Sequence, residues 1–129
     1  MYQLTRTLLV SLTLLAICGC TSQPGVPDQP MGMDPASWTN PIDLIPEAVG
    51  RRTWVISTTS DEAQAYFDQG MALRWAYNVN EAARSMREAR TADPRCAMCW
   101  WGEAFALGSF LNGGMSKEKS VYAFEAIEQ

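Results

Sequence analysis

The chain has 129 residues, with 14 acidic and 10 basic side chains and no histidine. This acidic balance argues against nucleic-acid binding, because cationic contacts to phosphate dominate that affinity. The lack of histidine in the sequence removes the commonest general base and the commonest metal ligand. The length allows one small domain.

The first 19 residues are typical of a secretory signal. Arg6 gives a positive start, and residues 8–17 form an apolar run that only Ser11 and Thr13 interrupt. The run is shorter than the roughly 20 residues that a membrane-spanning helix needs. The sequence therefore predicts a signal peptide over residues 1–19.

The signal ends in Ile17-Cys18-Gly19-Cys20, which resembles the lipobox of bacterial lipoproteins. Cys20 fits that pattern because small Gly19 precedes it, whereas Cys18 follows a bulky isoleucine. The resemblance implies cleavage after Gly19, lipidation of Cys20, and a place in the bacterial cell envelope, on the outer membrane facing the periplasm. Two or three acyl chains anchor a small domain durably. The alternative is an ordinary cleaved signal or an uncleaved anchor.

Residues 20–50 are interpreted as a lipidated cysteine followed by a proline-rich tether. Six of the seven prolines fall between Pro24 and Pro46, and the first three recur at every third residue. That spacing suits an extended polyproline II segment. Residues 51–60 hold a brief β-prone run, too short for a sheet, which we expect to lie as an extended lead-in against helices.

Four helices are expected in residues 61–129, so the predicted fold class is all-α. Thr59 and Glu62 have the spacing of a capping box before a first helix that ends near Trp75 or Tyr77. Asn78 can cap a second helix, which continues to about Ala92. It stops there because the proline of Asp93-Pro94 disfavours helical geometry in the residue before it.

The third helix is expected over residues 95–107, and the fourth from a cap at Ser116 to the chain end. A turn over residues 111–114 separates them. The first helix and the third share a pattern at a distance of 34 residues, which is the period of the tetratricopeptide repeat. The domain is therefore predicted as two antiparallel helix hairpins, with one repeat over residues 63–96 and a partial one over residues 97–129.

The repeat predicts a core in which small residues let helices approach large ones. Its expected members are Tyr66, Gly70, Leu73, Ala82, Met86, Ala89, Pro94, Trp100, Ala104 and Leu107. In the second copy Ser120, Phe124 and Ile127 are expected at the small, large and last positions, with Ser120 38 residues after Ala82. Stacked repeats usually need about three units and a polar cap. We therefore expect an N-terminal fragment of a longer protein, or else a last helix that docks onto something.

Three segments carry a closer resemblance. They read AQAYFDQG from Ala63, EAARS from Glu81 and DPRCAMCWWG from Asp93. They resemble a family of bacterial tetratricopeptide proteins with the pattern AQ-x-YFDQG, EA-x-RS and DP-x-CAMCYWG. The resemblance implies the helical repeat fold and a longer parent chain, and it implies no particular activity. Family members often have Phe-Asn-His where this chain has Tyr77-Asn78-Val79.

Cys96 and Cys99 are the residues whose type and spacing could support a chemical function. A helix N-terminus lowers thiol pKa values, but a thioredoxin-like use needs a βαβ context that the sequence lacks. Haem attachment needs histidine where Trp100 stands, and a zinc site needs a second ligand pair. A local disulfide in an oxidising periplasm, or packed thiols, is the favoured interpretation, and thiol-redox or soft-metal use with Met98 is the alternative.

The candidate binding surface is the stripe that lines the inner face of the first and third helices. By register its members are Gln64, Phe67, Met71, Arg74, Trp75, Met98, Trp101 and Phe105. Such side chains are enriched where proteins bind one another, although an apolar stripe is first of all a packing signal. The sequence thus predicts a non-catalytic interaction module with an unidentified protein partner, and no cofactor or metal.

Overall fold

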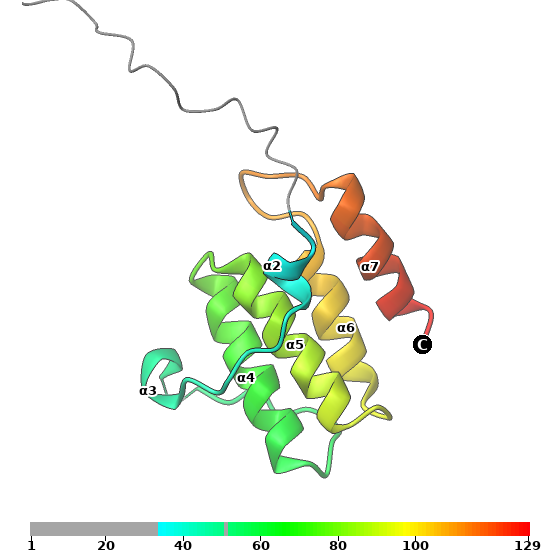
Figure 1. Ribbon diagram of the computed structural model, residues 1–129. Helices are drawn as coiled ribbons and strands as arrows, with labels where there is room; N and C mark the ends of the chain where they lie inside the picture. The colour runs from blue at the N-terminus through cyan, green and yellow to red at the C-terminus, as the bar shows by residue number, and fades with distance from the viewer. Residues whose placement is uncertain (1–33, 51) are drawn as a thin grey trace, which may run out of the picture. The chain divides into compact units, whose positions relative to one another are not determined.

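The computed structural model describes residues 34–50 and 52–129, and this part of the chain is all-α (Figure 1). Two short helices, α2 (Ala36–Thr39) and α3 (Pro46–Val49), precede four longer ones. These are α4 (Asp61–Trp75), α5 (Val79–Ala92), α6 (Ala97–Leu107) and α7 (Lys117–Ile127). The predicted signal peptide, Cys20 and the first part of the predicted tether lie outside the described residues.

Local signals fix both ends of α4. The Ser60 hydroxyl, rather than that of Thr59, accepts a hydrogen bond from the backbone N–H of Ala63, and Asp61 and Glu62 place negative charge in the first turn. At the other end Tyr77 takes the left-handed conformation, with φ at 67°. This turn lets the N–H of Asn78 donate to the carbonyl of Leu73, as in a Schellman closure.

The start of α6 differs from the sequence prediction by two residues. The helix begins at Ala97 because Cys96 is its N-cap, and the Cys96 sulfur accepts from the backbone N–H of Cys99. Helix α7 begins as expected, with the Ser116 hydroxyl accepting from the N–H of Lys119. Between these helices the chain reverses at a bridge that pairs Phe110 with Gly113.

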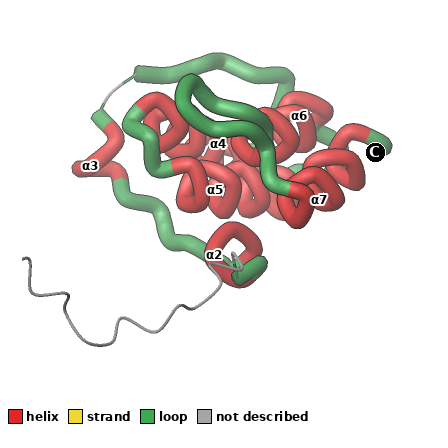
Figure 2. The backbone as a smooth tube through the Cα atoms, turned by 90° about the horizontal axis from the view of Figure 1, so that it is seen from above, coloured by secondary structure: helices red, strands yellow, loops and turns green. Residues whose placement is uncertain are grey.

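The four longer helices pack in chain order, each against the next, with α7 at the edge away from α4 (Figures 1 and 2). Helix α6 also packs on α4. The tightest approach is at Met86 of α5, which lies between Gly70 of α4 and Gly102 of α6. A Cβ atom at Gly102 would lie 2.5 Å from the Met86 sulfur, and one at Gly70 would lie 2.9 Å from it. Glycine at both positions therefore allows three helices to meet around one methionine.

Most of the predicted repeat core is buried. Gly70, Leu73, Ala82, Met86, Ala89, Ala104 and Leu107 have little or no exposed surface. Tyr66 and Trp100 are only half-buried, and Pro94 is exposed. Pro94 lies in the turn between α5 and α6, where its carbonyl accepts from the indole N–H of Trp100.

The register predicted for the fourth helix is wrong. Helix α7 buries Lys119, Ala123 and Ala126, whereas Phe124 and Ile127 are 63% and 65% exposed. The residues of α7 that match Ala82, Met86 and Ala89 therefore lie 37 residues on, not 38. Phe124 and Ile127 fall on another side of the helix.

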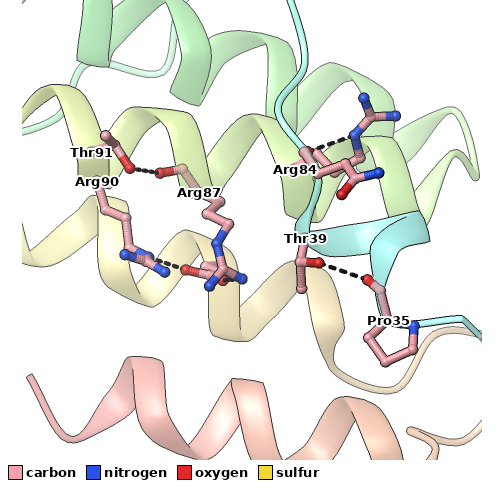
Figure 3. Close-up of polar contacts among 8 residues, drawn as sticks. Pro35, Thr39, Arg84, Arg87, Arg90 and Thr91 are labelled. Atoms are coloured by element: carbon pink, nitrogen blue, oxygen red, sulfur yellow. Dashed lines mark hydrogen bonds and ion pairs between the residues drawn. The ribbon is translucent and has the colours of Figure 1, made fainter.

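The predicted tether is also wrong for its second half, because residues from Ala36 to Ile45 pack on the helices. Trp38 is fully buried, with its ring edge-on to Tyr122 at 6.1 Å and beside the Lys119 ammonium. Figure 3 shows Arg84 of α5 reaching this segment, where it donates to the carbonyls of Asn40 and Pro41. Composition favoured an extended, solvated segment, but the burial of Trp38 and the hydrogen bonds from Arg84 fix it to the domain.

The lead-in before α4 lies extended against that helix. The Gln64 side chain accepts from the N–H of Ile56 and donates to the carbonyl of Trp54. Asp68 accepts from the N–H of Trp54. Further back, Gln69 accepts from the N–H of Ile45 and donates to the carbonyl of Asp43. Polar side chains on α4 thus hold the segment between α2 and α4.

Candidate functional site

The stripe predicted as a binding groove does not form one surface. Phe67, Met71 and Arg74 of α4 are buried, because α6 packs along this side of α4. A Cβ atom at Gly102 would lie 3.1 Å from the Phe67 ring. Gln64 is occupied by the lead-in, as described above. The half of the predicted groove on α4 is therefore an internal contact between the two hairpins, and Trp75 is exposed at its end.

Arg74 joins the two hairpins at the end of α6. Arg74 is 1% exposed, and its Nη2 donates to the carbonyl of Ser109 at 2.8 Å and that of Gly108 at 3.4 Å. The charge lies 4.1 Å from the centre of the Phe110 ring and 5.1 Å from that of Phe105. A cation beside the last carbonyls of a helix complements the helix dipole. Burial lowers the pKa of Arg74 from its usual range. Its position indicates a structural brace.

The half of the predicted groove on α6 is accessible. Trp101 is 41% exposed, Met98 is exposed to a similar degree, and Phe105 is half-buried. The rings of Trp101 and Phe105 are stacked, with 4.9 Å between their centres and 8° between their planes. These two aromatic side chains form one wall of a hollow between α6 and α7.

This hollow has a volume of about 810 Å³, and most of its lining is apolar. We call its lining the α6–α7 face. It consists of Trp101, Ala104 and Phe105 from α6 with its C-cap Gly108, of Ser120, Val121, Ala123, Phe124, Glu125 and Ile127 from α7, and of Met115 from the loop between them. Sequence reasoning missed the α7 half because it placed Phe124 and Ile127 in the core. The exposure of these two large side chains could be found only by fixing the phase of α7.

The cysteine pair is closed in the structure. Cys96 and Cys99 form a disulfide, and both residues are buried. Exchange requires a thiolate to reach one of the two sulfurs, so burial protects this bond. No group of three or more histidine, cysteine or carboxylate side chains in the described part of the chain could hold a metal ion. Met98 is exposed, whereas both sulfurs are enclosed.

A second polar cluster joins α5 to α6. Glu103 is almost fully buried and forms ion pairs with Arg87, at 3.1 Å, and with Arg90. Figure 3 shows both arginines extending from α5 toward α6. The Arg90 guanidinium also lies 4.3 Å from the centre of the Trp100 ring. Each charge is paired, so the cluster positions α6 and offers no unpaired acid or base.

Comparisons of the chain with known protein families, with curated proteins and with solved structures give no match. The tetratricopeptide resemblance and the lipoprotein signal therefore remain predictions from the sequence. Within residues 34–50 and 52–129, none of the helices combines the length and the apolar character required to span a bilayer.

Proposed function

We propose that this protein is a lipid-anchored component of the bacterial cell envelope that binds another protein through the α6–α7 face and has no catalytic role of its own. The observation that carries the proposal is the hollow of about 810 Å³ with exposed Trp101, Phe124 and Ile127 around it. Contiguous exposed apolar surface on a small protein marks an interaction site, because leaving it in water is unfavourable.

The aromatic and methionine content of this face supports protein binding in particular. Tryptophan, phenylalanine and methionine are enriched in the buried centres of protein interfaces. Glu125 is the charged residue in the lining. A thiol-redox or metal-binding role is not favoured, since both sulfurs of the cysteine pair are bonded to each other and buried.

The anchor is proposed from the sequence around Cys20. Because the chain packs on the domain from Ala36 onward, residues 21–35 are the part of the sequence between the lipidated cysteine and the packed segment. The test is metabolic labelling with a palmitate analogue in a bacterial host. Cys20→Ser should abolish the label and Cys18→Ser, its matched control, should retain it. Equal labelling of both variants would exclude Cys20 as the acylation site.

The binding surface is tested by placing a photo-crosslinking amino acid at one position of the full chain in living cells. At Phe124 it should give a covalent adduct with a distinct envelope protein, which mass spectrometry identifies. At Trp75, which is equally exposed but outside the α6–α7 face, it should give none. Adducts of the same size and abundance from both positions, or none from either, would exclude this face as the binding site.

A further inference from the structure

The structure shows how this chain itself covers a face of the same kind. Helix α6 lies against α4 and α5, with Gly102 beside Phe67 of α4 and Met86 of α5. The next residue, Glu103, pairs with Arg87 and Arg90 of α5. One helix therefore occupies the groove that the α4–α5 hairpin presents.

The α6–α7 face repeats that groove position by position. Its α6 residues, 34 positions on, replace those of α4. Trp101, Ala104, Phe105 and Gly108 correspond to Phe67, Gly70, Met71 and Arg74. Its α7 residues, 37 positions on in the register that burial defines, replace those of α5. Ser120, Ala123, Phe124 and Ile127 correspond to Ala83, Met86, Arg87 and Arg90. The α6–α7 face is therefore the equivalent, one hairpin further along the chain, of the groove that α6 covers.

Resting on the proposed function, we infer that the α6–α7 face binds an amphipathic α-helix of a partner protein, seated as α6 is seated on α4 and α5. A groove formed by two antiparallel helices accepts a third helix by the same ridge-and-groove packing that holds α6. The hollow lies at the position where this third helix would be seated.

The lining defines the side chains that this helix must carry. In the internal contact, Glu103 of α6 pairs with two arginines of α5. The equivalent positions on the α6–α7 face are Phe124 and Ile127, so the incoming helix needs an apolar residue where α6 has its carboxylate. In the internal contact, Gly102 of α6 lies against the bulky Met86. The equivalent position on the α6–α7 face is the small Ala123, so the incoming helix can carry a large residue where α6 has glycine. Two adjacent large apolar residues are therefore its signature.

The charge of α7 favours a helix of a partner protein over a second copy of this chain or an anionic lipid surface. The exposed surface of α7 and its C-cap carries Glu118, Glu125 and Glu128 against a single exposed cation, Lys117. A second copy of α7 would bring like charges together, and a surface of anionic lipid would be repelled in the same way. A partner helix with lysine or arginine beside its apolar stripe is complementary.

The test uses labelled peptides derived from α6 and the purified full chain in detergent. The binding peptide spans residues 95–109, extended by lysines, with Cys96→Ser, Cys99→Ala, Gly102→Leu and Glu103→Leu. Its matched control keeps Glu103. Fluorescence anisotropy should show the control binding at least about tenfold more weakly, because its carboxylate is buried without a partner. The chain variant Phe124→Glu should lose the binding peptide, and Trp75→Glu should keep it.

Introducing arginines into the α6–α7 face tests whether the peptide occupies the position that α6 occupies on α4 and α5. The double variant Phe124→Arg with Ile127→Arg recreates the pair that receives Glu103, so it should bind the Glu103 peptide better than the leucine peptide. Circular dichroism checks that each variant remains folded. Equal affinity for both peptides in wild type and double variant would overturn the inference. If neither peptide binds while Phe124 still crosslinks a distinct envelope protein, the helix inference fails and the proposed function stands. A crosslinked dimer or lipid adduct at Phe124 would overturn both.

Discussion

Arg74 shows how a single buried side chain can join two helix hairpins. It extends from α4 to the carbonyls of Gly108 and Ser109 just after α6, and it lies between the Phe105 and Phe110 rings. Its Nε and Nη1 have no hydrogen-bond partner among the described residues. The residue therefore acts through one donor group, its charge and its contact with the rings.

Replacing Arg74 should destabilise the domain substantially. Arg74→Ala removes a charged donor and buried packing, and we expect it to lower the free energy of unfolding by about 2–4 kcal/mol. The free energy of unfolding of Arg74→Lys should fall between those of the wild type and Arg74→Ala, because an ammonium cannot stack on the rings as a guanidinium does. Urea denaturation measures both, with exposed Arg52→Ala as the control at about 0.5 kcal/mol or less. An Arg74→Ala change no larger than that of the control would contradict the brace.

Asp93 makes stability depend on pH. The Thr58 hydroxyl, at 2.6 Å, is the main cause that lowers the pKa of this carboxyl, and the backbone N–H and charge of Arg95 act in the same direction. A lowered folded-state pKa means that the ionised form stabilises the fold. This contribution is present at neutral pH, above the usual pKa of the carboxyl, and is lost as the pH falls through the lowered value.

Thr58→Val should remove the pH-dependent part of this effect. The difference in free energy of unfolding between wild type and variant should be largest at neutral pH and shrink in acid. Denaturation at a series of pH values measures it, and Thr59→Val, at an exposed neighbour, is the control. A constant difference across the series would show that the hydroxyl does not set the Asp93 pKa.

At the scale of elements, the approach of α4, α5 and α6 depends on one large and two small residues. Met86 lies between Gly70 and Gly102 and is fully buried. Met86→Ala should leave a cavity and cost about 2–5 kcal/mol. Gly102→Val should overpack the same space and cost about 1–3 kcal/mol. The double variant should be more stable than the sum of the two losses predicts, because the valine enters the cavity. Additive losses in urea denaturation would contradict this packing.

The disulfide and the N-cap of α6 share one sulfur, and their contributions can be separated. Cys96→Ser with Cys99→Ala removes the disulfide but keeps a capping oxygen, and it should cost about 2 kcal/mol or less, since the closed loop is short. Cys96→Ala with Cys99→Ala also removes the cap and should cost about 1 kcal/mol more. Thermal unfolding compares the pairs. Equal melting temperatures would show that Cys96 does not cap the helix.

At the scale of the whole described domain, the segment from Ala36 to Ile45 packs across the helices, and we call it the strap. Trp38 of this segment is fully buried beside Tyr122 of α7, and α2 packs on α5. Trp38→Ala should lower the free energy of unfolding by about 3–5 kcal/mol. Val55→Ala, at an exposed position in the lead-in, should change it by about 0.5 kcal/mol or less. Equal effects in urea denaturation would show that the strap does not stabilise the domain.

The four longer helices could be predicted from the sequence because their signals are local, whereas the short helices α2 and α3 were not predicted. Serine before acidic residues starts α4, and Asp93-Pro94 ends α5. The same logic predicted that Gly70 is a point of close approach. The packing of the strap was not predictable from composition, since it depends on the burial of Trp38 and on hydrogen bonds from Arg84 and Gln69, which are distant in the sequence. The phase of α7 was wrong by one residue because the loop before it breaks the 34-residue period, so the repeat does not fix which side of α7 is buried.

The sequence by itself determined that the domain is all-α, approximately where its four longer helices lie, and that Gly70 lets two of them meet. The tertiary structure alone decided which stripe is a surface. Phe67 and Trp101 occupy equivalent positions 34 residues apart, yet Phe67 is buried and Trp101 is 41% exposed. The physical reason is that burial depends on the neighbouring helix. Helix α6 covers the α4–α5 groove, and no described helix covers the α6–α7 face.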